Sequence, residues 1–151
     1  MRRRKRMITA VIIAVCLALI AWALWMVPSI RYHSEEQVVD KFFKAMEQKD
    51  FDTAYGIYNA DPEWKQHPEK YKQYPLSQFT LDWGPSGDAG VITSHKIDCV
   101  KEPDKKGFAS PSGVIVAVTL NNRQDDTSIW VEKKTKTLTN SPFPLVCHPP
   151  K

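Results

Sequence analysis

Residues 34–55 read SEEQVVDKFFKAMEQKDFDTAY, and this stretch decides the fold predicted for the chain. Ser34 and Gln37 have the spacing of a capping box, in which both side chains satisfy the first backbone N–H groups of a helix. The apolar residues that follow recur three and four positions apart and form one face of an amphipathic helix: Val38, Val39, Phe42, Phe43 and Met46. This face needs a second layer, and a sheet is the expected one.

Helices are expected to fill the first half of the region after residue 33. The first helix is predicted to end near Lys49-Asp50, and a shorter second helix then turns Ala54, Tyr55 and Tyr58 inward. Three prolines between Asp61 and Pro75 allow single helical turns but no long helix. Residues 76–81 are predicted to form another short helix.

Strands are expected to fill the second half. Segments rich in β-branched residues at 91–100, 113–120, 127–132 and 137–140 alternate with polar turns, as in a series of hairpins. The segment 113–120 is apolar on both faces, which predicts a central strand. Helices followed by antiparallel strands predict an α+β domain with its helices on one side of the sheet.

The order of elements, with Val38 to Phe43 and then Lys49 to Tyr55, resembles the nuclear transport factor two-like superfamily. The resemblance covers roughly residues 34–142 and implies a strongly curved antiparallel sheet that forms a cone with an internal pocket. Members of the superfamily include isomerases, dehydratases, small-molecule binders and assembly domains. The resemblance therefore implies a fold and leaves the activity open.

An uncharged segment from Met7 to Val27 precedes this domain and predicts a transmembrane helix, because its 21 residues would span about 31 Å as a helix. Five cations on one flank, Arg2, Arg3, Arg4, Lys5 and Arg6, place the N-terminus in the cytoplasm. Trp22 and Trp25 are expected at the opposite interface. The predicted layout is a cytoplasmic tail at 1–6, a span at 7–27, a spacer at 28–33 and an extracytoplasmic domain at 34–151.

A cleaved signal peptide is the alternative, because Ala21-Trp22-Ala23 has the small residues of a cleavage site. The apolar run continues past that site to Val27, which favours an uncleaved anchor in a bacterial inner membrane. Cys16 follows the bulky Val15 and is interpreted as a packing residue of the span, not as a lipid-modified cysteine.

Charge and cysteine content point away from nucleic acid and toward an oxidising compartment. The chain has 21 Lys+Arg, five of them in residues 2–6, so the remainder carries 16 against 17 Asp+Glu. A basic surface for nucleic acid is therefore not supported. Cys99 and Cys147 remain in the domain and are predicted to form a disulfide that pins the Pro-rich tail. Two independently buried thiols are the alternative.

The sequence carries no catalytic, metal or cofactor motif, and the four histidines are scattered without metal-ligand spacing. An isomerase-type pocket would need a desolvated carboxylate and a tyrosine facing the substrate oxygen. Asp82 and Tyr58 are the best candidates for these roles, with His95 as a further one. A turn-bracing role for Asp82 and a core role for His95 are the structural alternatives.

Aromatic residues are the candidate binding groups, with packing as their alternative role: Tyr58, Trp64, Tyr71, Trp83 and Trp130. The leading hypothesis is a non-catalytic membrane-anchored domain that binds an envelope protein, a second copy or a small ligand. The runner-up is a pocket enzyme or carrier that uses Asp82 and Tyr58. Lys133 to Lys136 is interpreted as a solvated hairpin tip, with lipid or partner contact as the alternative.

Overall fold

The computed structural model describes residues 13, 15–22, 32–103, 112–141, 145 and 147, and the chain divides into two compact units, Met1–His33 and Ser34–Lys151. In the first unit, residues 15–22 are helical. No helix within the described residues has both the length and the apolar content needed to cross a bilayer. The rest of the predicted span, residues 7–12, 14 and 23–27, lies outside the described residues.

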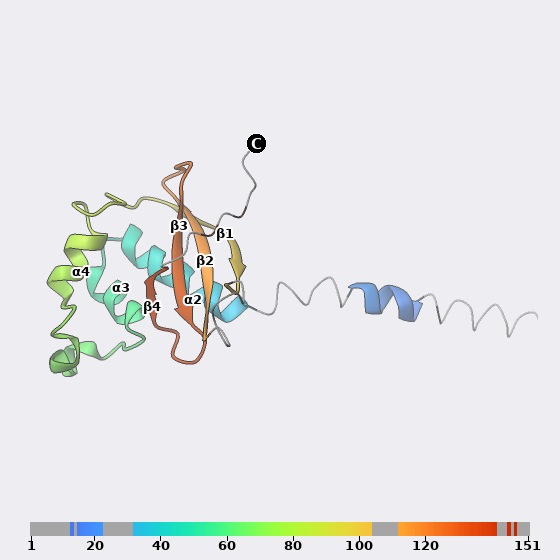
Figure 1. Ribbon diagram of the computed structural model, residues 1–151, viewed down its shortest axis with the longest axis horizontal. Helices are drawn as coiled ribbons and strands as arrows, with labels where there is room; N and C mark the ends of the chain where they lie inside the picture. The colour runs from blue at the N-terminus through green and yellow to red at the C-terminus, as the bar shows by residue number, and fades with distance from the viewer. Residues whose placement is uncertain are drawn as a thin grey trace, which may run out of the picture. The chain divides into compact units, whose positions relative to one another are not determined.

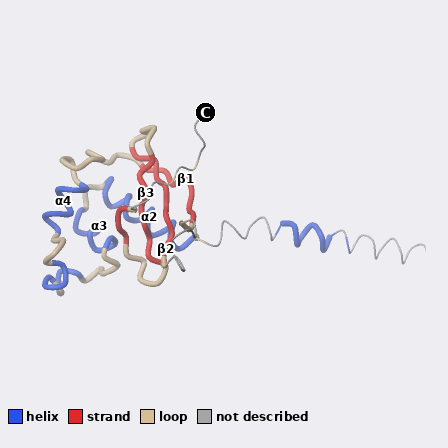
Figure 2. Tube along the Cα trace, viewed as in Figure 1, coloured by secondary structure: helices blue, strands red, loops and turns tan. Residues whose placement is uncertain are grey.

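From His33 onward, five helical segments, three α-helices and two 3₁₀ turns, precede the first strand (Figures 1 and 2). Helix α2 spans His33–Glu47 and α3 spans Phe51–Tyr58, and Asp50 caps α3 by accepting from the backbone N–H of Thr53 at 3.1 Å. Two 3₁₀ turns follow, η1 (Trp64–Gln66) and η2 (Pro68–Tyr71), and then α4 (Leu76–Trp83). The prolines thus limit this region to single turns, as predicted.

The predicted capping box at the start of α2 is wrong. The helix begins one residue earlier, at His33, so Ser34 is not its N-cap. The Ser34 hydroxyl instead donates to Glu35 Oε2 at 2.8 Å and accepts from Lys136 Nζ at 3.1 Å. The partner of Ser34 is thus Lys136, which lies 102 residues further along the chain. Local spacing in the sequence cannot reveal such a contact.

Four antiparallel strands form an open sheet in the order β1-β2-β3-β4, which confirms the α+β class. Their bounds are His95–Lys101, Gly113–Leu120, Asp126–Glu132 and Leu138–Asn140. Strand β1 starts four residues later than predicted, because the Asn121 side chain binds the preceding segment. Asn121 Oδ1 accepts from the Thr93 backbone N–H at 2.7 Å, and its Nδ2 donates to the Val91 carbonyl at 2.8 Å.

The helices cover one face of the sheet (Figure 1). Pairing of Val116 with Ile129 and of Val114 with Val131 puts these four side chains on that face, and all are buried. The core between the layers is rich in aromatic rings, including fully buried Phe42, Phe43, Tyr55 and Phe79. Four of the five residues predicted for the apolar face of α2 are buried in this core: Val39, Phe42, Phe43 and Met46.

The opposite face of the sheet holds the disulfide. Cys99 pairs in register with Ala117 and is bonded to Cys147, with 5.8 Å between their Cα atoms. Two residues that precede Cys147 in the sequence also bond to β3: the Ser141 N–H donates to the Ser128 carbonyl and the Leu145 N–H donates to Ser128 Oγ, both at 2.9 Å. The predicted disulfide is confirmed, and Ala117 beneath it is fully buried.

Candidate functional site

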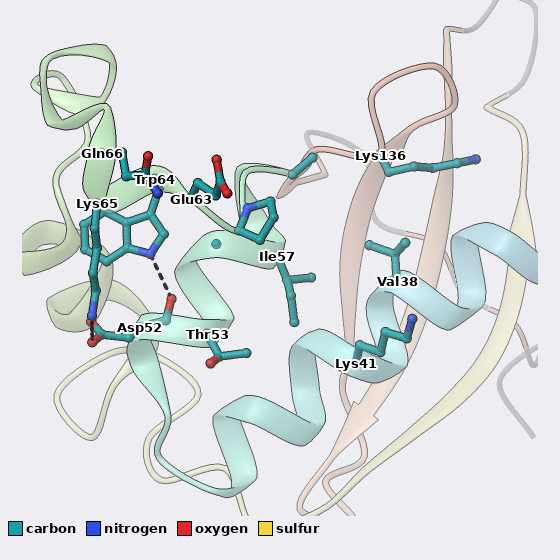
Figure 3. Close-up of a pocket in the computed structure, with 13 residues that line it drawn as sticks. Val38, Lys41, Asp52, Thr53, Ile57, Glu63, Trp64, Lys65, Gln66 and Lys136 are labelled. Atoms are coloured by element: carbon teal, nitrogen blue, oxygen red, sulfur yellow. Dashed lines mark hydrogen bonds and ion pairs between the residues drawn. The ribbon is translucent and has the colours of Figure 1, made fainter.

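An open groove of about 610 Å³ lies between α2, α3 and η1 (Figure 3). Val38 and Ile57 line it from the two helices, and Pro62 and Trp64 line it from the segment after α3. Ala60 and Gly56 complete a lining that is more apolar than polar. A Cβ on Gly56 would lie 3.3 Å from the Trp64 ring, so glycine allows this ring to sit close against α3.

Charged side chains surround the apolar part of the groove. On the α3 side, the Lys65 ammonium pairs with Asp52 and lies 5.6 Å from the Trp64 ring centroid. The Trp64 indole N–H donates to the Asp52 carbonyl at 3.2 Å, which fixes the ring as a wall of the groove. Lys41 on α2 and Glu63 before η1 are exposed, and neither has an ion-pair partner among the described residues.

Lys136, which lines the groove, forms an ion pair with the buried Glu35. Glu35 has a side chain that is only 6% exposed, and its Oε1 lies 2.5 Å from Lys136 Nζ. Burial alone would raise the pKa of Glu35, but the hydrogen bonds from Lys136 and Ser34 outweigh it and hold the pKa below its usual value. In Figure 3 the Lys136 side chain extends away from Trp64.

This pair predicts a specific loss of stability in acid. Because the folded-state pKa of Glu35 lies below the unfolded value near 4.5, the pair stabilises the fold above that pH and stops doing so as pH falls through the folded pKa. Glu35→Gln is expected to lower the unfolding free energy at pH 7 by about 1–3 kcal/mol and to flatten the decline below pH 5. Denaturant titrations from pH 7 to pH 3 measure both effects.

Glu63→Gln is the matched control, because it changes the same chemical group at an exposed position. It should leave the unfolding free energy at pH 7 within about 0.5 kcal/mol of the parent. Equal losses in the two variants would contradict a structural role for the pair.

The predicted binding aromatics fall into three separate places. Trp64 and Tyr71 both pack edge-on against Tyr55, with ring centroids 4.8 and 5.9 Å from it. Tyr58 and Trp83 lie deeper and flank Phe42, at 6.1 and 5.2 Å. Trp130 lies on β3 opposite Ile115, on the sheet face that carries Cys99. Of the five, only Trp64 lines the large groove.

Asp82 lies at the end of α4 and is exposed, so the desolvation predicted for it is not found. The turn-bracing alternative is not found either, because Asp82 accepts from side chains: from Tyr74 Oη at 2.9 Å and from Gln78 Nε2 at 2.8 Å. Tyr58, and not Asp82, is the desolvated group. Burial raises the pKa of its phenol, and the nearby Asp82 charge raises this pKa further.

A smaller hollow of about 260 Å³ is lined by both Asp82 and Trp83. The Trp83 indole nitrogen is the one buried side-chain polar atom in the described part of the chain that lacks a hydrogen-bond partner. Tyr74 lies nearby, and burial and the hydrogen bond to Asp82 raise the pKa of its phenol. Tyr71 donates in the same way to Asp61 at 2.6 Å, which raises its pKa to about 12.

His95 has the structure of a core histidine. Its side chain is 8% exposed, and its ring stacks on Phe43 with centroids 5.5 Å apart. Nδ1 lies 2.7 Å from Glu47 Oε1 and Nε2 lies 3.3 Å from Asp40 Oδ1, so both nitrogens bind carboxylates of α2. His95 therefore joins β1 to α2. Across the described residues, no three His, Cys, Asp or Glu side chains converge as metal ligands would.

The groove itself was not predicted from the sequence. Val38 shares the helical row of Phe42 and Met46, and that spacing predicts a core position, but Val38 is only half-buried and lines the groove. Nothing in the sequence marked Ile57 and Pro62 as binding residues, because single apolar residues near a turn are common. Comparison of the chain with protein-family models, with curated proteins and with solved structures gave no match.

Proposed function

We propose that this chain is a single-pass protein of a bacterial inner membrane whose extracytoplasmic domain binds another envelope protein without catalysis. In this proposal residues 7–27 are the anchor, the N-terminus is cytoplasmic, and the α+β domain has the cone shape of the nuclear transport factor two-like superfamily. The uncharged segment flanked by five cations supports the anchor. The Cys99–Cys147 disulfide supports an oxidising compartment.

The open apolar groove is the observation on which the binding role rests. Its apolar lining is exposed between two helices and surrounded by charged side chains, which is the arrangement of many protein-binding surfaces. Trp64 forms one wall, and tryptophan is enriched among the residues that dominate binding energy at such surfaces. The ion pair between Asp52 and Lys65 holds the Trp64 ring in place when no binding protein is present.

Photo-cross-linking at the groove tests this role in cells. A photoreactive amino acid at Glu63 is expected to give one discrete adduct, whose mass distinguishes a second copy of the chain from another envelope protein. The same amino acid at Gln124, an exposed position in the β2–β3 connection, is the matched control and should give none. Ile57→Asp should abolish the Glu63 adduct, because it puts a charge into the apolar lining.

Two results of that experiment would contradict the binding role. Equal adducts from Glu63 and Gln124 would show only random collision in the envelope. An adduct that survives Ile57→Asp would show contact outside the groove. Circular dichroism of the purified variant distinguishes a lost surface from a lost fold.

A small-molecule enzyme or carrier that uses Asp82 and Tyr58 is the second candidate. One observation favours it: Asp82 and Trp83 line the same hollow, close to the desolvated Tyr58 hydroxyl. A ligand that shifts the indole N–H resonance of Trp83 and leaves the Trp64 indole N–H unchanged would favour this candidate over the groove.

A further inference from the structure

The turn between β3 and β4 lies against the first turn of α2. Lys136 at the end of this turn bonds to Ser34 Oγ at 3.1 Å and to Glu35 Oε1 at 2.5 Å, across a sequence separation of about a hundred residues. Figure 1 shows the β3–β4 connection at the end of the sheet where α2 begins. The turn therefore sits beside the residue at which the domain joins its spacer.

The neighbouring strand ends belong to the same surface. The Lys133 N–H donates to the Ser112 carbonyl at 2.9 Å, and its ammonium pairs with Glu102 at 2.6 Å. Lys101 ends β1 next to Glu102, opposite Ile115 of β2. We call this surface the tether end, defined by Ser34, Glu35, Lys101, Glu102, Ser112 and Glu132 to Lys136.

Among the described residues of the tether end, the charged side chains that are exposed rather than half-buried are lysines. Lys101 and Lys134 are exposed, and neither has an ion-pair partner among the described residues. The three carboxylates of the tether end are buried or half-buried, and each has a hydrogen-bond or ion-pair partner. Glu35 is buried against Lys136, Glu102 is half-buried against Lys133, and Glu132 is half-buried and accepts from Ser112 Oγ at 2.8 Å.

The spacer limits how far this surface can lie from lipid. Residues 28–33 follow the proposed span directly and reach at most about 20 Å when fully extended. A lysine near an anionic membrane surface gains about a fivefold preference for contact, and the effect extends over one Debye length, about 8–10 Å at ordinary salt. With the proposed anchor, the domain therefore begins within about 20 Å of the bilayer.

We propose that the tether end rests on the bilayer, with Lys134 and Lys101 against anionic lipid headgroups. This inference relies on the anchored topology of the proposed function. The Glu35–Lys136 pair fixes the turn to the start of α2 and so sets the orientation of the domain. In this orientation α2 runs away from the membrane, and its C-terminal end at Glu47 points into the extracytoplasmic space.

The test uses the full-length chain reconstituted into vesicles. A membrane-impermeant amine-acylating reagent is applied, and peptide mass spectrometry gives the reaction rate of each lysine. In vesicles containing phosphatidylglycerol, Lys134 and Lys101 are expected to react roughly fivefold more slowly than in pure phosphatidylcholine. Lys49, exposed just after the far end of α2, is the matched control and should react equally in both.

Further measurements make the outcomes separable. Addition of 1 M salt should restore the Lys134 rate, because it shortens the Debye length to about 3 Å. Intact mass is measured first: a chain that begins at Leu24 would overturn the anchored topology and this orientation with it. An intact chain whose Lys134 rate is the same in both vesicles would overturn the orientation alone.

A charge-reversal variant gives an independent check on the same preparation. Lys134→Glu is expected to remove the lipid dependence of the Lys101 rate, because it places a like charge against the headgroups. Since Lys134 is exposed and has no ion-pair partner in the part of the chain that the structure describes, the variant should keep the denaturation midpoint of the parent. Unchanged lipid dependence at Lys101 in a folded variant would contradict a role for Lys134.

Discussion

Phe42→Ala is expected to lower the unfolding free energy by about 3–5 kcal/mol, the cost of deleting a buried aromatic ring and leaving a cavity. The ring has no exposed surface and is the centre of an aromatic cluster. Its centroid lies 5.0 Å from Phe43 and 5.2 Å from Trp83, both edge-on. Chemical denaturation of the parent and the variant measures the change.

Val38→Ala is the matched control for this prediction, because Val38 lies one helical turn before Phe42 in the same row. Its side chain is half-buried at the groove, so its loss should cost less than about 1 kcal/mol. Equal costs at the two positions would mean that α2 packs with a different face. The pair of variants thus tests the orientation of the helix as well as the density of the core.

The double variant Cys99→Ser, Cys147→Ser is expected to lose about 4 kcal/mol of unfolding free energy. The disulfide closes a segment with a sequence separation of 48 residues, and the chain-entropy relation gives this value for a loop of that length. Loss of the crosslink also releases the tail from the sheet face above Ala117. Denaturant titration with and without reducing agent measures the effect.

Cys16→Ser is the control, because it removes a cysteine that is free in the structure. It should leave the stability of the domain unchanged, and the reducing agent should destabilise it as much as the parent. One reactive thiol is expected in the denatured, unreduced parent. Three reactive thiols would contradict the disulfide.

Local chemistry was sufficient for the elements and their order. The 3.6-residue spacing of Val39, Phe42, Phe43 and Met46 predicted α2 and the face that it buries, because helical periodicity is a property of the sequence itself. The apolar run 113–120 predicted the central strand for the same reason. Two cysteines in a domain predicted to be exported left a single intradomain pairing, and that pairing is the one found.

Sites that depend on contacts between distant segments could not be predicted in this way. Asp82 has Leu81 and Trp83 beside it in the sequence, which predicted burial, but α4 turns Asp82 to solvent and Trp83 into the core. Trp130 was grouped with Tyr58 and Trp64, and strand alternation instead places it on the opposite sheet face. The nearest neighbours of a residue do not show which side of an element faces the protein.

The sequence by itself determined the α+β class, the order of the elements with helices before strands, and the disulfide. Periodicity and composition encode these features locally. The tertiary structure decided the groove, the partners of His95 and the position of the β3–β4 turn beside α2. The contacts of His95 join residues 48 and 55 positions apart, and Lys136 with Ser34 joins residues 102 apart. Such contacts exist only after the helices have packed on the sheet, since no local pattern specifies which turn meets which helix.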